Sequence, residues 1–130
     1  MLGLYHDPVY EYPVYHSEVS YFHLEKIREI GISGIVTNFL GQVAADHLNG
    51  FWIHLDADVL GDRLMPCVDS RTPGGLLYEE LEQALLPLLC SEHCLGLSVT
   101  ILDPELDTNS SVTNAFAENL INIINKCKAA

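Results

Sequence analysis

Two apolar runs separated by one helical pattern constrain the fold of this 130-residue chain most strongly. Residues 51–57 and 95–102 are nearly all apolar and have the length of strands, while residues 77–90 place leucines on one side of a helix. A strand, a helix and a second apolar strand predict a right-handed parallel crossover. Because parallel sheets are covered on both faces, we expect a three-layer α/β/α fold with a mostly parallel sheet.

Other segments are expected to add helices around this unit. The predicted helices run from Ser17 or Ser20 to Ile30 (ended by Gly31), over residues 35–48, and from a cap at Ser110 or Ser111 to the C-terminus. Pro87 should kink or end the helix at 77–90. The tyrosine-rich residues 1–16 are expected to be extended or loop-like. Either they add a strand, or the chain is part of a larger sheet.

Composition limits the classes of function. Apolar residues make up 48% of the chain and the net charge is −12, which indicates one folded domain over residues 1–130 and argues against binding to nucleic acid or an anionic membrane. No stretch is long enough to span a bilayer, and no signal peptide is seen. We therefore expect a cytoplasmic protein whose four cysteines are reduced thiols.

Asp56 and Asp58 are the candidate site residues. They stand at the carboxyl end of the apolar run that starts at Phe51, where ligands bind in open parallel sheets. Carboxylates buried there must be hydrogen-bonded, paired or bound to a metal, and their oxygens suit a divalent cation. The alternative is a pair of solvated acids at a strand end.

Three motifs in order resemble the ureohydrolase family of arginase, agmatinase and formiminoglutamase. They are Asp56-Ala57-Asp58, the loop that ends in Pro73-Gly74-Gly75-Leu76, and the strand that ends near Asp103-Pro104. The resemblance implies a three-layer α/β/α fold with a binuclear Mn²⁺ site. It further implies that a metal-bridging hydroxide hydrolyses C–N bonds of guanidino or formimino compounds. It makes Asp56 and Asp58 metal ligands, and leaves the catalytic and substrate-binding residues unknown.

The sequence also departs from this family pattern at several positions. The family's Gly-Gly-Asp-His turn and Asp-Ala-His-x-Asp strand end do not occur in this sequence, and Gly61-Asp62 replaces an Asp-Pro. Ile101 stands where arginases have a glutamate that holds the guanidinium. The chain therefore resembles the C-terminal part of an arginase-like fold. We expect it to be inactive alone, and to form a homo-oligomer or associate with a missing N-terminal portion.

Parts of the sequence are compatible with three other interpretations. A non-catalytic interaction module with a degenerate arginase-like scaffold remains the alternative. A phospho-acceptor receiver domain shares the length and a Met65-Pro66 pair, but the spacing from a strand-end aspartate is wrong. Cys90-Ser-Glu-His93-Cys94 lacks the second ligand pair of a zinc knuckle.

The remaining polar and aromatic residues have ordinary structural interpretations. His54 is expected to be buried with a hydrogen-bond partner, and Trp52 to lie in a core or an interface. Asp62 and Asp69 are expected in turns, with Arg71 paired to Asp69 or another acid.

Overall fold

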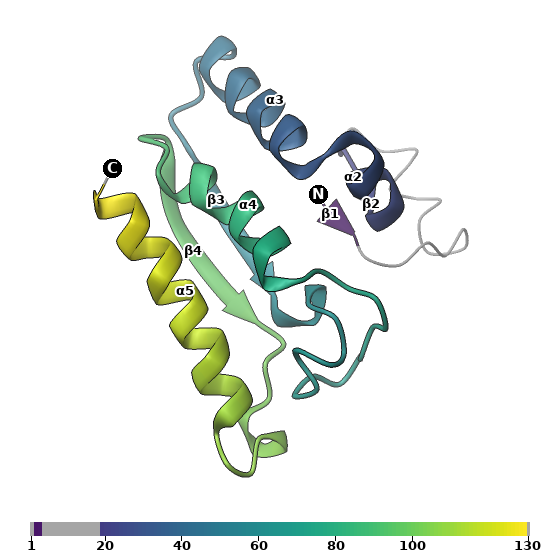
Figure 1. Ribbon diagram of the computed structural model, residues 1–130. Helices are drawn as coiled ribbons and strands as arrows, with labels where there is room; N and C mark the ends of the chain where they lie inside the picture. The colour runs from purple at the N-terminus through teal and green to yellow at the C-terminus, as the bar shows by residue number, and fades with distance from the viewer. Residues whose placement is uncertain (1, 4–18, 130) are drawn as a thin grey trace.

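The computed structural model describes residues 2–3 and 19–129, so the predictions for Ser17 and for the tyrosines before it lie outside the described residues. The elements are β1 (Leu2–Gly3), β2 (Phe22–His23), α2 (Leu24–Ile30), α3 (Ile32–Ala45), β3 (Phe51–Asp56), η1 (Ala57–Val59), α4 (Tyr78–Leu89), β4 (Cys94–Thr100), η2 (Pro104–Leu106) and α5 (Ser111–Ala129). Figure 1 shows their arrangement.

The predicted parallel crossover is confirmed. β3 and β4 pair in parallel, with Trp52 opposite Gly96 and Asp56 opposite Thr100, and α4 connects them. β1 and β2 form a second, separate parallel pair. The α/β class with a parallel sheet is thus correct, and among the described residues the sheet of β3 and β4 has two strands.

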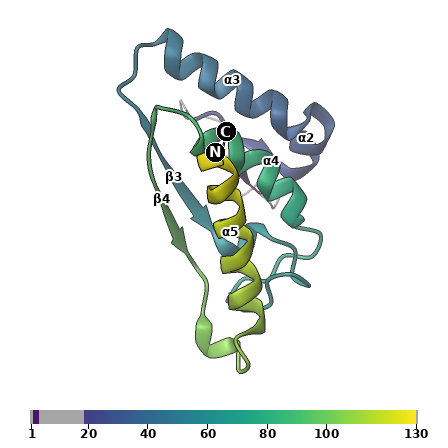
Figure 2. The ribbon, with the colours of Figure 1, turned by 60° about the vertical axis from the view of Figure 1, so that its left-hand side comes forward.

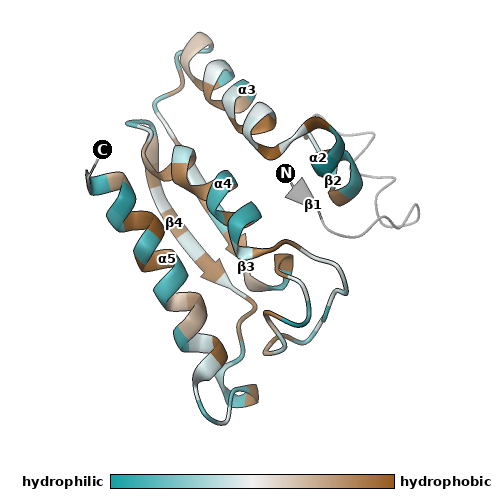
Figure 3. Cartoon of the chain, viewed as in Figure 1, coloured by the Kyte–Doolittle hydropathy of each residue, from teal (hydrophilic) through white to brown (hydrophobic). Residues whose placement is uncertain are grey.

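The helices α4 and α5 lie on the same side of the β3–β4 sheet (Figure 2). The core between these layers is apolar and contains Ile53 and Leu55 of β3, Leu81 and Leu85 of α4, and Phe116 and Ile123 of α5. Figure 3 shows how hydrophobic and hydrophilic residues alternate along α5, as expected of a helix that buries one face. The chain therefore builds the sheet together with the helical layer on one of its faces.

The interpretation of the run at 51–57 as a wholly buried strand is wrong. β3 alternates, with Ile53 and Leu55 buried while Trp52 and His54 point away from the helices and are exposed. A continuous apolar run is typical of a strand covered on both faces, but here the described residues cover one face.

The N-terminal helix boundaries differ from the predictions. α2 begins at Leu24, and its cap is His23 rather than Ser20, because the His23 Nδ1 accepts the Lys26 N–H at 3.4 Å. Gly31 ends α2 at φ 90° and directly precedes α3, so α3 starts at Ile32 instead of residue 35.

The C-terminal helices also depart from the predictions. α4 continues through Pro87 to Leu89, where the half-buried Leu88 and Leu89 pack on the core. At α5 the cap is supplied by Asp107, whose Oδ2 accepts the Thr113 N–H at 2.7 Å.

The expectation of reduced thiols is corrected for one pair. Cys90, at the C-terminal end of α4, and Cys127, in the last turns of α5, form a disulfide with their Cα atoms 5.2 Å apart. Cys67 and Cys94 are free. The described helices include none that is long and apolar enough to cross a membrane.

Candidate functional site

The two predicted acids lie together where β3 ends. Asp56 is the last residue of β3, and Asp58 follows in the short turn η1. Ala57 between them is fully buried, and the Leu60 N–H donates to the Ala57 carbonyl at 3.2 Å. The buried alanine and this hydrogen bond fix the turn, so both carboxylates stay at the carboxyl edge of the sheet.

One oxygen of Asp56 is engaged by neighbours on the strands. The Thr100 hydroxyl donates to Asp56 Oδ1, and the His54 Nε2 lies 3.2 Å from the same oxygen. The His54 Nδ1 is 2.9 Å from the Ser98 hydroxyl. The predicted hydrogen-bond partner of His54 is confirmed, but its predicted burial is wrong, since 61% of its side chain is exposed.

The pKa of Asp58 is raised above its ordinary value. Partial burial is the main cause, and the negative charges of Asp56 and then Asp69 add to it. Asp69 was interpreted as a turn residue, yet it lies close enough to act on Asp58.

The loop between η1 and α4 is fastened to the fold at several points. Met65, Cys67 and Val68 are buried, the Asp103 N–H donates to the Cys67 carbonyl at 2.9 Å, and the Leu76 N–H donates to the Val59 carbonyl at 2.8 Å. This long loop without helix or strand is therefore an ordered segment beside Asp56 and Asp58.

Glycines allow this loop to close on itself. Gly74 has φ 75°, a left-handed conformation that suits glycine. Gly75 lies against Gly61, and a Cβ at Gly75 would stand 2.7 Å from the Gly61 nitrogen. Only glycine fits this close approach.

Two arginines hold the loop, Arg28 from α2 and Arg71 from within the loop itself. Arg28 of α2 pairs with both Glu80 carboxylate oxygens, at 2.8 and 2.9 Å, and its guanidinium donates to the carbonyls of Gly74 and Gly75. The hydrogen bond to Glu80 raises the pKa of Arg28 and lowers the pKa of Glu80. Arg71 reaches Asp62 at 3.7 Å, which confirms its pairing with an acid.

Ile101 directly follows β4. It has φ 73°, which is unusual for a β-branched residue, and it is 43% exposed. The position that the family resemblance assigns to a guanidinium-binding glutamate therefore carries an apolar side chain.

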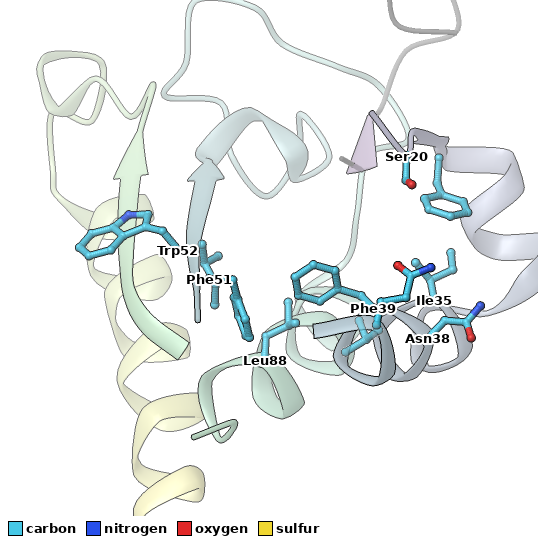
Figure 4. Close-up of a pocket in the computed structure, with 11 residues that line it drawn as sticks. Ser20, Ile35, Asn38, Phe39, Phe51, Trp52 and Leu88 are labelled. Atoms are coloured by element: carbon cyan, nitrogen blue, oxygen red, sulfur yellow. The ribbon is translucent and has the colours of Figure 1, made fainter. Parts of the chain in front are cut away.

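A cavity of about 510 Å³ lies away from the acids, at the other end of β3. Phe39, Phe51 and Leu88 are among its lining residues, and the rings of Phe39 and Phe51 meet edge to face at 5.0 Å (Figure 4). Asp56 is about 17 Å along the strand from Phe51 at ~3.3 Å per residue. The cavity and the acids are separate features.

A sequence model of the arginase family matches residues 4–124 of this chain. The chain belongs to the arginase family. Formimidoylglutamase of Bacillus subtilis (strain 168) is 28% identical over 105 residues, which cover 81% of this chain and 33% of that protein. Arginase of Brucella melitensis biotype 1 is 25% identical over 120 residues, which cover 92% of this chain and 39% of that protein.

Solved arginase-family structures share this fold. The crystal structure of the Bacillus subtilis formimidoylglutamase matches with a TM-score of 0.81 and 26% identity, over 95% of this chain and 39% of that one. Helicobacter pylori arginase has the same fold, with a TM-score of 0.78, 24% identity, and coverage of 98% of this chain and 43% of that one. The chain thus spans about two fifths of the length of these arginase-family structures.

The aspartates at the end of β3 have the donor type of a metal site but, among the described residues, too few donors. Carboxylate oxygens suit manganese, but the described part of the chain has no group of three His, Cys, Asp or Glu side chains arranged to hold an ion. The donor type therefore fits the family's binuclear site, and the number of donors does not.

Proposed function

We propose that this chain carries part of the metal site of an arginase-family hydrolase, one that cleaves C–N bonds in guanidino or formimino compounds. Asp56 and Asp58 are the metal ligands in this proposal, and manganese is the metal. The remaining ligands come from outside the described residues, in an upstream portion of the fold or a partner chain. Alone, the chain is catalytically inactive.

The observation that carries this proposal is the environment of Asp58. Its pKa is raised by burial and by Asp56 and Asp69, so this edge of the sheet concentrates negative charge at the place where parallel sheets bind ligands. The family membership supports the assignment of hydrolase chemistry. The inactivity follows from the donor count, because manganese-type octahedral sites take about six oxygen-type donors.

A metal titration combined with a product assay tests this proposal. We expect weak Mn²⁺ binding, measured by the loss of the free Mn²⁺ electron paramagnetic resonance signal, that both Asp56→Asn and Asp58→Asn remove. Asp46→Asn is the matched control, because Asp46 lies at the far end of α3. We also expect no urea or formamide release from guanidino or formimino substrates.

Two results would contradict the proposal in different ways. Family-like hydrolysis by the purified chain with Mn²⁺ would show that it is not inactive alone. Mn²⁺ binding that survives both substitutions would show that these aspartates are not the ligands.

A second candidate function is a non-catalytic interaction module. It is favoured by the hydrogen bond that Thr100 donates to Asp56 Oδ1, by the His54 Nε2 that lies 3.2 Å from the same oxygen, and by the apolar Ile101. It predicts no Mn²⁺ binding at all, so the same titration separates the two candidates.

A further inference from the structure

A disulfide joins the ends of the two helices that cover the β3–β4 sheet. Cys90 directly follows α4, and Cys127 lies in the last turn of α5. Their Cα atoms are 5.2 Å apart, and 37 residues separate them in the sequence. Cys90 is exposed to solvent, whereas Cys127 is half-buried. A thiol in solution can therefore reach the bond from the side of Cys90.

Apolar packing holds both helices on the sheet independently of this bond. Leu81 and Leu85 of α4 and Phe116 and Ile123 of α5 are buried in the hydrophobic core. Their burial does not require a covalent link between the two helices. Opening of the disulfide should therefore leave the sheet and the body of both helices in place.

The last part of α5, residues 124–128, has few other attachments, and we call it the α5 end. The exposed side chains there are those of Asn125, Lys126 and Lys128. The Lys126–Glu82 ion pair also connects the α5 end to α4, but exposed ion pairs add little stability. Segments with few buried contacts open locally at low cost in free energy. The disulfide is therefore the strongest attachment of the α5 end.

Thiol–disulfide exchange provides a balanced route by which the bond opens. A small-molecule thiolate attacks the exposed Cys90 sulfur and forms a new S–S bond there. The Cys90–Cys127 bond breaks, and its electron pair stays on the Cys127 sulfur, which takes up a proton. A second thiolate then attacks the small-molecule sulfur of this mixed disulfide and releases Cys90. Two small-molecule thiols are oxidised to one disulfide, and both cysteines are reduced to thiols.

The two free cysteines are less well placed to take part. Cys67 is buried, and burial raises the pKa of its thiol, so little of the reactive thiolate forms. Cys94 is half-buried at the start of β4, and its thiol lies 3.9 Å from the Gly96 carbonyl of the same strand. Exchange with a thiol in solution is therefore expected at Cys90 and Cys127.

We propose that the Cys90–Cys127 disulfide is a reversible redox latch. When oxidised it fixes the α5 end to α4. A small-molecule thiol of the glutathione class opens it, and Cys90 carries the mixed disulfide. The latch goes beyond the proposed hydrolase function and needs neither metal nor substrate. It differs from a purely structural disulfide because the chain stays folded when the latch opens, and the latch closes again when a small-molecule disulfide is supplied.

Hydrogen–deuterium exchange of the intact chain measures the opening. Reduction should raise the exchange rate of the α5 end by about tenfold or more and leave β3 and β4 within about twofold of the oxidised chain. Cys127→Ser should exchange fast with or without reductant. Cys94→Ser is the matched control and should respond like wild type. Oxidised glutathione should restore slow exchange in reduced wild type.

Three outcomes of this measurement would overturn the proposal. They are an α5 end whose exchange does not change on reduction, an equal rise across the sheet, and a reduced chain that oxidised glutathione does not close again. The first would show that the bond does not hold the α5 end, the second that the fold itself needs the bond, and the third that the bond is not reversible.

Mass spectrometry locates the cysteine that is attacked. The oxidised chain is treated briefly with reduced glutathione, free thiols are blocked with N-ethylmaleimide, and the chain is digested with pepsin in acid, where exchange stops. We expect glutathione on Cys90 and maleimide on Cys127. Glutathione found as often on Cys127, or a bond that resists millimolar glutathione, would overturn the proposal. None of these outcomes depends on Mn²⁺ binding at Asp56 and Asp58.

Discussion

The Cys90–Cys127 disulfide gives the most quantitative prediction. It closes a loop across 37 residues, and the loss of unfolded-chain entropy for a loop of that length corresponds to about 4 kcal/mol at 25 °C. The exposed Lys126–Glu82 ion pair joins the same helices but adds little, since surface pairs contribute ~0–1 kcal/mol. With an unfolding entropy of ~2.1 cal/mol/K per residue, Cys127→Ser should lower the Tm of the oxidised chain by roughly 14 °C.

Calorimetry with and without reductant measures this effect. Reduced wild type and Cys127→Ser should unfold at the same temperature, and oxidised wild type well above both. Cys94→Ser, which removes a free thiol, is the matched control and should keep the difference between oxidised and reduced forms. If oxidised and reduced wild type unfold together, or if four free thiols titrate without reductant, the reasoning is wrong.

Two further predictions concern the cap of α5 and the loop beside the acids. The pKa of Asp107 is lowered chiefly by the hydrogen bond from the Thr113 N–H. The stability that the ionised Asp107 contributes is therefore complete above its unfolded pKa of ~3.9 and is lost as pH falls through the lower folded pKa. In urea unfolding, Asp107→Asn should have a lower free energy of unfolding than wild type near neutral pH, and this difference should become smaller in acid. A difference that does not change with pH would refute this prediction. Gly75→Ala places a Cβ 2.7 Å from the Gly61 nitrogen and should lower the free energy of unfolding by about 1–3 kcal/mol. Gly41→Ala is the control, because a Cβ there would meet nothing within 4 Å, and it should be neutral or stabilising. Equal effects of the two substitutions in urea unfolding would contradict the close packing at Gly75.

The central crossover could be predicted from sequence because its signals are local. The apolar runs around Ile53 and Leu97 and the leucine pattern of α4 each specify one element, and chirality then specifies their connection. The exposure of Trp52 and His54 could not be predicted in this way. It depends on which face of the sheet the rest of the chain covers, and an apolar run does not reveal that.

Only part of the candidate site could be predicted from the sequence, because the rest depends on how distant segments come together. Asp56 and Asp58 are two residues apart at a strand end, so their position is visible in the sequence. Thr100 reaches Asp56 through the strand register, and Asp69 comes close through the fold of a long loop. Neither register nor loop conformation has a local signal.

The burial of Met65, Cys67 and Val68 has a consequence for how the acidic edge can work. A segment anchored in this way cannot swing open without exposing core side chains, so it cannot serve as a gate that opens for each incoming molecule. The position of this segment beside Asp56 and Asp58 is instead set when the polypeptide folds. Whatever reaches these carboxylates should come and go at a rate limited by diffusion and binding rather than by a moving lid.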